Sequence, residues 1–139
     1  MLATACACAK LRRASRLVTR LYDEALAPAK LKVTQFSLLR SVERAGAASL
    51  SELAALTGFE RTTLSRDLQR LAADGLVAFG AGADPRARRA TVTTRGRAAM
   101  QRALPHWKRA QERFASELGV ERHGALFALL DEVERITHG

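Results

Sequence analysis

The sequence predicts a mainly α-helical fold that carries one small β-hairpin. Over most of the chain, apolar residues recur every three or four positions, which is the period of a helix with one buried face. Residues 76–93 instead hold two short runs rich in Val, Phe and Thr around a stretch of glycine and arginine, the pattern of a hairpin. A chain of 139 residues, 47% of them apolar, supports one domain of ordinary size. We therefore expect a single domain, residues 1–139.

The N-terminal segment predicts a long helix from about Ala5 to Ala27, which Pro28 ends. Apolar residues at steps of three and four form one seam along it: Leu11, Ala14, Val18, Leu21 and Ala25. Basic residues lie mostly off this seam: Lys10, Arg12, Arg13, Arg16 and Arg20. The first twenty residues contain basic residues and no acid, a composition that also resembles a transit peptide. The seam indicates instead that the folded protein needs this helix.

A second helix is predicted over residues 33–42, capped by Thr34 or a neighbour, with Phe36, Leu39 and Val42 pointing inward. The small residues 45–48 end it.

Residues 49–73 predict two helices around a tight turn. Ser49-Leu-Ser-Glu52 fits a capping box, in which Ser49 accepts a backbone N–H and Glu52 reaches back to another. Thr57-Gly58-Phe59 ends this first helix and begins the next, which is helix-turn-helix spacing. The second helix buries a stripe made of Leu64, Leu68 and Leu71.

The other face of the helix at 61–73 combines hydroxyls, one amide and arginines with a single acid, Asp67. The residues concerned are Arg61, Thr62, Thr63, Ser65, Arg66, Gln69 and Arg70. An isolated helix of this kind is more often a solvated surface. These side chains are also the ones that reach base edges and phosphates in nucleic acids.

After this helix, Gly75 can adopt the left-handed conformation that ends a helix. Leu76-Val-Ala-Phe79 is predicted as a strand, residues 80–89 as a flexible basic loop, and Ala90-Thr-Val-Thr93 as the returning strand. A helix-turn-helix followed by a hairpin with an arginine-rich tip is a winged helix.

The last third of the chain predicts further helices. Residues 94–118 form a long segment with Pro105 as an expected kink. A second apolar stripe follows: Leu126, Leu129, Leu130, Val133 and Ile136. Both ends of the chain therefore carry apolar helical faces outside the winged helix, which another part of the chain or a second copy could cover.

Motifs in residues 31–97 resemble those of the MarR family of bacterial transcriptional regulators. In order they are Leu50-Ser-Glu-Leu-Ala54, Thr63-Leu-Ser-Arg66, Leu71-Ala-Ala-Asp-Gly-Leu-Val77, Asp84-Pro-Arg-Ala-Arg-Arg89 and Thr93-Thr-Arg-Gly96. The resemblance implies that residues 31–93 are the DNA-binding part, and that residues 5–30 and 94–137 are dimerisation helices. It also implies an obligate homodimer that binds a palindromic operator in double-stranded DNA and regulates transcription, as a repressor.

In that family the polar face of the helix at 61–73 would enter the major groove, where Arg pairs with guanine and Gln with adenine. The wing residues Arg86, Arg88 and Arg89 would enter or flank the minor groove. Asp84 matches the family's wing aspartate, which is expected to pair with an arginine and hold the shape of the wing.

The net charge of +9 and the pI near 10.9 predict an anionic partner, either nucleic acid or an acidic membrane surface. No apolar run approaches the ~20 residues of a transmembrane helix, so we expect no membrane partner. The two cysteines lie close together near the start, which excludes a disulfide framework and favours the reducing cytoplasm.

Cys6 and Cys8 are candidates for redox sensing, although such residues can equally be small, inert helix residues. Cys8 lies beside the apolar seam, near basic residues that stabilise a thiolate, and its place is similar to that of the peroxide-sensing cysteine in the OhrR subgroup. Tyr22 falls where that subgroup places a tyrosine that helps bind the sensing cysteine, whereas Val33 replaces a second tyrosine. Oxidation could proceed through a small thiol, through Cys6, or between the Cys6 residues of two copies. A disulfide between Cys6 and Cys8 on a regular helix would need local unwinding.

A small-molecule effector, usually an aromatic acid in the resembled family, is the other alternative. Candidates for lining its pocket are Tyr22, Phe36, Leu39, Arg40, Trp107 and Arg109. Phe36 and Trp107 could equally be core aromatics. A metal is disfavoured, because a zinc site needs four ligands and the three histidines lie far from the cysteines without paired spacing. We expect no metal and no cofactor.

The sequence contains no paired carboxylates at a catalytic spacing, no nucleophile motif and no glycine-rich phosphate loop, so we do not expect an enzyme. The competing hypothesis is a basic architectural protein that binds DNA without sequence preference. Such a protein would share the charge but would not need the hydroxyl-rich helical face.

Overall fold

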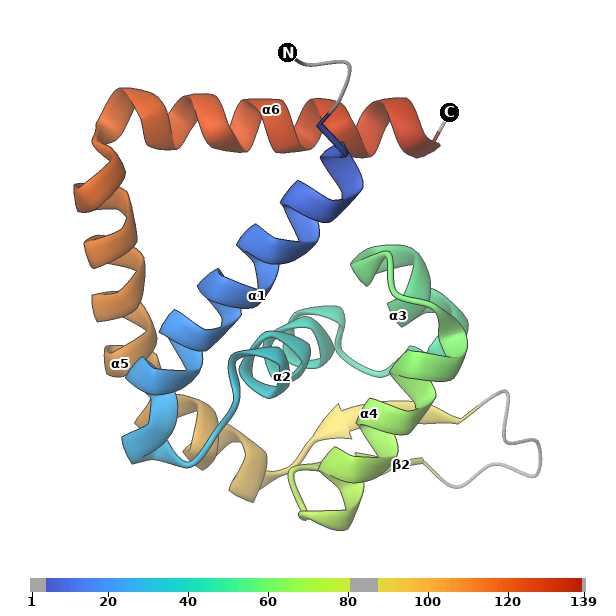
Figure 1. Cartoon of the computed structure of the whole chain (residues 1–139). Helices are drawn as coiled ribbons and strands as arrows, with labels where there is room; N and C mark the ends of the chain where they lie inside the picture. Colours follow the sequence, from blue (N-terminus) through green and yellow to red (C-terminus); the bar gives the residue numbers. More distant parts are fainter. Residues whose placement is uncertain (1–4, 81–87, 139) are drawn as a thin grey trace. The chain divides into compact units, whose positions relative to one another are not determined.

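Figure 1 shows the computed structural model of the chain, which describes residues 5–80 and 88–138. The chain divides into two compact units, Met1–Trp107 and Lys108–Gly139. The elements are α1 (Ala7–Leu26), the 3-10 helix η2 (Ala27–Ala29), α2 (Val33–Ala45), β1 (Ala48–Ser49), α3 (Leu50–Thr57), α4 (Arg61–Ala73), β2 (Val77–Phe79), β3 (Arg89–Val92), α5 (Thr94–Leu118) and α6 (Val120–His138). The fold is mainly helical with a small β wing, which confirms the predicted class.

The β-sheet has three strands in the order β1-β3-β2, and both pairs are antiparallel. The predicted hairpin is β2 and β3, with Val77 opposite Val92. The sequence did not indicate β1, which holds two residues and places Ser49 opposite Arg89. The predicted loop is also one residue too long, because β3 begins at Arg89 rather than Ala90. Pairing with β1 draws that arginine into the sheet.

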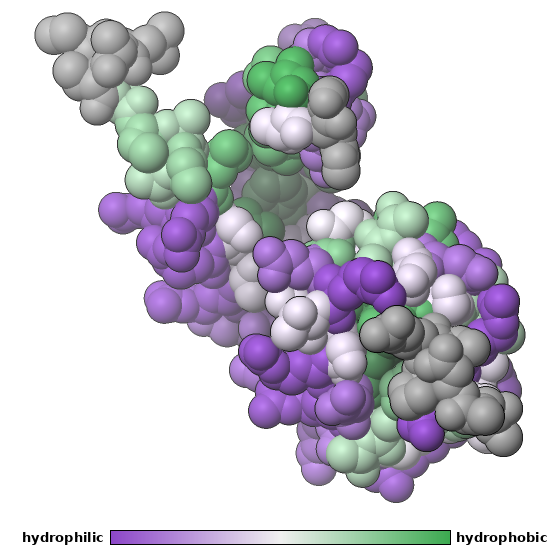
Figure 2. Space-filling model, turned by 90° about the vertical axis from the view of Figure 1, so that its right-hand side faces the viewer, coloured by the Kyte–Doolittle hydropathy of each residue, from purple (hydrophilic) through white to green (hydrophobic). Residues whose placement is uncertain are grey.

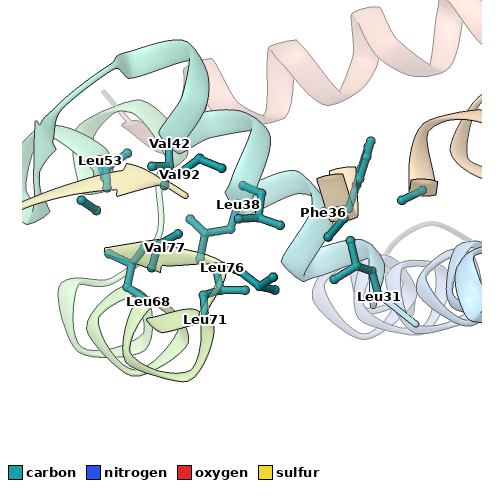
Figure 3. Packing of buried hydrophobic residues seen from close by; sticks show 14 of the residues in the cluster. Leu31, Phe36, Leu38, Val42, Leu53, Leu68, Leu71, Leu76, Val77 and Val92 are labelled. Carbon is teal, nitrogen blue, oxygen red and sulfur yellow. The ribbon is translucent and has the colours of Figure 1, made fainter. Parts of the chain in front are cut away.

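The core of the first unit lies between α2, α4 and the sheet (Figure 3). Phe36, Leu39 and Val42 of α2 are fully buried, as the spacing of apolar residues predicts. The α4 stripe of Leu64, Leu68 and Leu71 is also buried. Each such side chain contributes roughly 1.5–3 kcal/mol by leaving water. This packing orients α4, because its apolar edge is buried while its polar face stays outside.

Helix α1 begins at Ala7 rather than Ala5, with Cys6 as its N-cap. In Figure 2 the pale green start of α1 is followed by purple, hydrophilic residues. Only the C-terminal part of the helix is well packed, through Tyr22 and Leu26. On the predicted seam, Leu11 is 43% exposed and Ala14 is also exposed, and Leu17, which lies off the seam, is 51% exposed. The first two residues of the predicted seam are therefore uncovered, whereas Val18, Leu21 and Ala25 are partly buried.

Helix α2 begins at Val33, as predicted, and runs three residues beyond the predicted end at Val42. Its N-cap is Lys32, not Thr34. The N–H of Lys32 donates to Gln35 Oε1 at 3.0 Å, and the N–H of Val33 donates to Asp23 Oδ1 at 2.8 Å. The first turn of α2 is therefore satisfied partly by its own third residue and partly by α1.

Pro105 lies inside α5, and the helix continues through it. Within the second unit, the His123 ring lies 4.6 Å from that of Phe127 and 6.1 Å from that of Phe114. The predicted α6 stripe is largely exposed, with Leu129 at 65% and Ile136 at 64%. In the part of the chain that the structure describes, no helix is both long enough and apolar enough to span a bilayer.

Candidate nucleic-acid interface

Helices α3 and α4 are held in place by caps at the turn between them and at the start of α3. The predicted capping box is confirmed: the N–H of Glu52 donates to Ser49 Oγ at 3.2 Å, and the N–H of Ser49 donates to Glu52 Oε2 at 3.2 Å. Gly58 ends α3 in the left-handed conformation, with φ of +74°. The hydroxyl of Thr57 accepts from the N–H of Phe59 at 3.3 Å. The capping box fixes where α3 begins, and the turn at Gly58 fixes where α3 ends and α4 can begin.

The polar face of α4 is available to a partner. All its predicted contact residues are exposed except Ser65, which is partly buried. An open depression gathers several of them, together with Leu50: Arg61, Thr62, Ser65, Arg66 and Gln69. The Gln69 amide donates to Ser65 Oγ at 3.4 Å. In the lower part of Figure 2, purple and white residues dominate the surface, with green patches between them.

Two predicted contact residues on α4 lie apart from this depression. Arg70 lines a separate hollow with Asp67 and residues at the start of α2, including Lys32 and Gln35. Thr63 is exposed but does not line the depression. Arg70 is therefore placed at the flank of the polar face.

The wing brings Arg88 close to α4. A hollow of about 140 Å³ lies between α4 and the sheet, with Ser65, Gln69 and Arg88 among its lining residues. Its other lining is mostly apolar: Ala48, Leu50, Leu68, Phe79 and Ala90. Arg86 and Asp84 lie outside the described residues. Among the predicted wing arginines that the structure describes, Arg88 is therefore the one that lines a hollow together with residues of the α4 face.

Arg89 has a different environment. Its Nη1 donates to the carbonyl oxygen of Ala47 at 2.8 Å and forms an ion pair with Glu52 Oε2 at 3.2 Å. The sequence pointed to Arg89 only as a wing cation. The capping motif identified Glu52, but it gave no sign that one carboxylate serves both a helix cap and a wing arginine.

The junction between the wing and α5 depends on Thr93 and Gly96, which sequence reasoning used only as part of a family motif. The Thr93 hydroxyl donates to the Gly75 carbonyl oxygen at 2.6 Å and accepts from the N–H of Gly96 at 3.0 Å. A Cβ at Gly96 would lie 2.1 Å from the carbonyl oxygen of Leu76. Only a glycine permits this close approach of α5 to the hairpin.

The candidate sensing residues are spread along α1. Cys6 and Cys8 are free and exposed, and Cys6 Sγ accepts from the N–H of Ala9 at 3.4 Å. Tyr22 is buried, which raises the pKa of its hydroxyl. Cys8 and Tyr22 are separated by fourteen positions of one helix, a rise of about 21 Å. One chain therefore does not bring Tyr22 to either cysteine.

Three of the predicted pocket residues form a cluster. The rings of Phe36 and Trp107 lie 5.6 Å apart. The Arg40 guanidinium carbon lies 4.5 Å from the centroid of Trp107 and 5.8 Å from that of Phe36. Leu39 is fully buried in the core, and Arg109 belongs to the second unit. Among the described residues, no group of three His, Cys, Asp or Glu side chains is placed to hold a metal ion.

The model of the MarR family matches residues 29–90 of this chain. The structure of the transcriptional regulator MosR of M. tuberculosis in complex with DNA is 42% identical, covers 94% of this chain and 99% of that one, and has a TM-score of 0.77. BpsR of Bordetella bronchiseptica, whose DNA binding is regulated by 6-hydroxynicotinic acid, is 25% identical with a TM-score of 0.80, covering 94% of each chain. A mutant of MarR from E. coli, complexed with operator DNA, shares the fold at 24% identity and a TM-score of 0.79, covering 88% of this chain and 89% of that one. A comparison with curated proteins gives no significant match.

Proposed function

Because this chain belongs to the MarR family, we propose that it is a dimeric regulator of transcription, acting as a repressor, that binds a palindromic site in double-stranded DNA. The observation that carries this proposal is the exposed face of α4, where arginines, hydroxyls and an amide surround one open depression. Those groups match the hydrogen-bonding edges of bases and the charge of phosphates. MosR has been seen with DNA bound, and it covers almost all of this chain. A regulator of this kind works in the cytoplasm, where its DNA lies.

The α4 residues that line the depression enter the major groove in this proposal, together with Thr63. Arg70 lies at the flank of this face. Arg86 and Arg88 approach the neighbouring minor groove, and Asp84 holds the wing shape. The hollow shared by Ser65, Gln69 and Arg88 supports the view that α4 and the wing contact one stretch of DNA.

Dimerisation is supported by the uncovered apolar faces of the terminal helices. Leu11 and Leu17 on α1, and Leu129 and Ile136 on α6, are all at least 43% exposed. A monomer rarely leaves so many large apolar side chains in water along two helices. The outer face of α1 is basic, whereas α6 carries Asp131, Glu132 and Glu134. A second copy could cover the apolar side chains and bring the basic residues of α1 near the acidic residues of α6. It would also supply the two-fold symmetry of a palindromic operator.

Random-sequence selection at physiological salt tests the function. The purified protein should enrich one palindromic sequence, with half-sites about one helical turn apart. The competing architectural protein would bind all sequences alike, because nonspecific affinity comes almost entirely from counterion release. Equal affinity for the selected site and for random DNA over a salt titration would support that competitor.

Control of DNA affinity has two candidate mechanisms, oxidation of the cysteines or binding of a small ligand. In the first, a hydroperoxide oxidises one thiol to a sulfenic acid and is reduced to an alcohol, and a second thiol then condenses with it to release water. Cys6 is the extended N-cap and only Cys8 lies in α1, so pairing them would disturb less helix than the sequence alone implied. In the second, an aromatic acid would contact the cluster of Phe36, Arg40 and Trp107.

The two mechanisms can be separated by measuring DNA affinity before and after an organic hydroperoxide, in the wild type and in Cys6→Ser and Cys8→Ser variants. Loss of affinity that depends on a cysteine supports oxidation. Unchanged affinity in all three proteins would favour the ligand mechanism.

A further inference from the structure

The carboxylate of Glu52 is shared between two elements. It accepts the backbone N–H of Ser49 at 3.2 Å, which caps the first turn of α3. It also lies 3.2 Å from Nη1 of Arg89, the first residue of β3. One side chain therefore joins the start of the helix-turn-helix to the base of the wing.

Backbone contacts reinforce the same junction. Ser49 and Arg89 are directly opposite each other in the β1–β3 pair. Arg89 Nη1 also donates to the carbonyl oxygen of Ala47 at 2.8 Å. The guanidinium is thus held from two sides, by a carboxylate of α3 and by the main chain just before β1. These bonds direct Nη1 of Arg89 toward α3 and the start of β1.

The ion pair adds little to the stability of the fold. The side chain of Arg89 is 52% exposed and that of Glu52 is 53% exposed, so water and salt screen their attraction. The geometric effect is larger, because Arg89 is the residue at which the returning chain enters β3 and pairs with β1. Loss of the pair would loosen the hold of α3 and β1 on the first residue of β3.

We propose that Glu52 and Arg89 are a positioning pair that fixes the wing relative to α4 for DNA binding, and that Arg89 does not itself contact DNA. This inference rests on the proposed function. It replaces the DNA-contact role that the sequence indicated for Arg89, and it gives Glu52 a role in DNA affinity although its charge has the same sign as the phosphates.

Whether DNA affinity rises or falls when Glu52 is replaced shows if Arg89 contacts DNA or positions the wing. If Arg89 contacts DNA, replacing Glu52 with a neutral residue frees a cation and removes a repulsive anion, so affinity rises or stays the same. If the pair positions the wing, the same replacement lowers affinity. Glu52→Gln is the suitable variant, because glutamine can still accept the Ser49 N–H and preserve the cap.

The experiment measures operator affinity by fluorescence anisotropy over a range of KCl concentrations for Glu52→Gln, Arg89→Met and the double variant. Each single variant should weaken binding about fivefold, and the double variant should also lose about fivefold rather than the product of the two, because both remove one interaction. The slope of log affinity against log salt should not change. Arg88→Met is the matched control: as a DNA contact it should weaken binding and reduce that slope by about 0.9 for each phosphate that is no longer neutralised.

Hydrogen exchange in the free protein gives a readout independent of DNA. The backbone amides of Ala48–Ser49 and Arg89–Ala90 should exchange faster in both single variants, while the melting temperature changes little. Unchanged exchange, tighter binding by Glu52→Gln, or a reduced salt slope for Arg89→Met would each overturn the positioning role. If the wild type shows no preference for any DNA sequence, the proposed function fails, and the exchange data still decide whether the pair restrains the wing.

Discussion

Gly96 shows how strongly packing can restrict a single position beside the DNA-binding unit. A Cβ at this residue would lie 2.1 Å from the carbonyl oxygen of Leu76 and 2.8 Å from Cγ1 of Val92. The first contact is with backbone, which cannot rotate away as a side chain can. Thr93 fixes the same junction by bonding both Gly75 and Gly96. The glycine is therefore required for the approach of α5 to the hairpin.

We predict that Gly96→Ala lowers the free energy of unfolding by about 3 kcal/mol, because the added methyl group must displace backbone. Urea denaturation followed by circular dichroism measures the effect. Gly124→Ala is the control: Gly124 lies in α6, and nothing lies within 4 Å of the place that its Cβ would take, so alanine should stabilise the helix by about 0.5–1 kcal/mol. Equal effects of the two substitutions would contradict the steric explanation.

Arg66 tests the proposed interface at single-residue resolution. It is exposed, it lies within α4, and it lines the central depression. Arg66→Ala should weaken operator binding by about 1–3 kcal/mol. A loss confined to one base-pair position would identify a base contact, whereas a uniform loss with a smaller salt slope would identify a phosphate contact.

The control for Arg66 is Arg113→Ala. Arg113 is an exposed arginine of α5 whose side chain pairs with Glu117 at 3.1 Å, and it should leave DNA affinity unchanged. If both variants bound the operator as the wild type does, the placement of α4 in the major groove would be wrong.

At the scale of elements, the sequence predicted best where local chemistry decides the structure. The capping box at Ser49, the glycine turn at Gly58 and the leucine stripe of α4 each appear as expected, because caps, left-handed turns and helical periodicity are set by neighbours in the chain. Strand β1 could not be predicted, since two residues give no alternation. The ion pair between Arg89 and Glu52 depends on the pairing of β3 with β1. The sequence therefore predicted the capping role of Glu52 but not its contact with Arg89.

Helix α1 shows a second limit of sequence reasoning. Its apolar period was clear, but the period says nothing about which partner covers the seam. The exact first residue also depended on a cap, since Cys6 Sγ accepts the N–H of Ala9 and leaves Cys6 outside the helix. By contrast, the distance between Cys8 and Tyr22 could have been obtained from the helical rise alone.

The contact between α2 and α5 yields a prediction about an effector. Trp107 is the single tryptophan of the chain, so its fluorescence reports on the cluster with Phe36 and Arg40. An aromatic carboxylate bound there should quench the emission, and Arg40→Met should weaken that binding about tenfold by removing the cation. Arg44→Met, a basic residue in the last turn of the same helix, is the control. A titration with benzoate, a simple aromatic carboxylate, measures both, and quenching that is equal in the two variants would rule out Arg40 as a ligand contact.

At the scale of the whole molecule, the excess of positive charge and the uncovered apolar faces have to be explained together. The net charge of +9 favours any polyanion, and it cannot by itself give sequence preference. Preference requires several base contacts at a fixed spacing, which one α4 face supplies for only half of a palindrome. A second copy held by the terminal helices would double the contacts and fix their separation. Dimerisation and DNA specificity should therefore be lost together.

This coupling can be tested on α6. Leu129→Asp places a charge in the exposed stripe and should raise the dimer dissociation constant at least about 100-fold, because an interface anchor is replaced by an ion that must be desolvated. Operator affinity should fall with it, and high protein concentration should restore part of both. Ala128→Asp is the matched control, since Ala128 is exposed on the same helix but lies on the side away from the stripe. Sedimentation velocity and anisotropy at the same concentrations measure the two effects. A Leu129→Asp protein that is monomeric yet binds the operator at wild-type affinity would show that one chain reads its site alone.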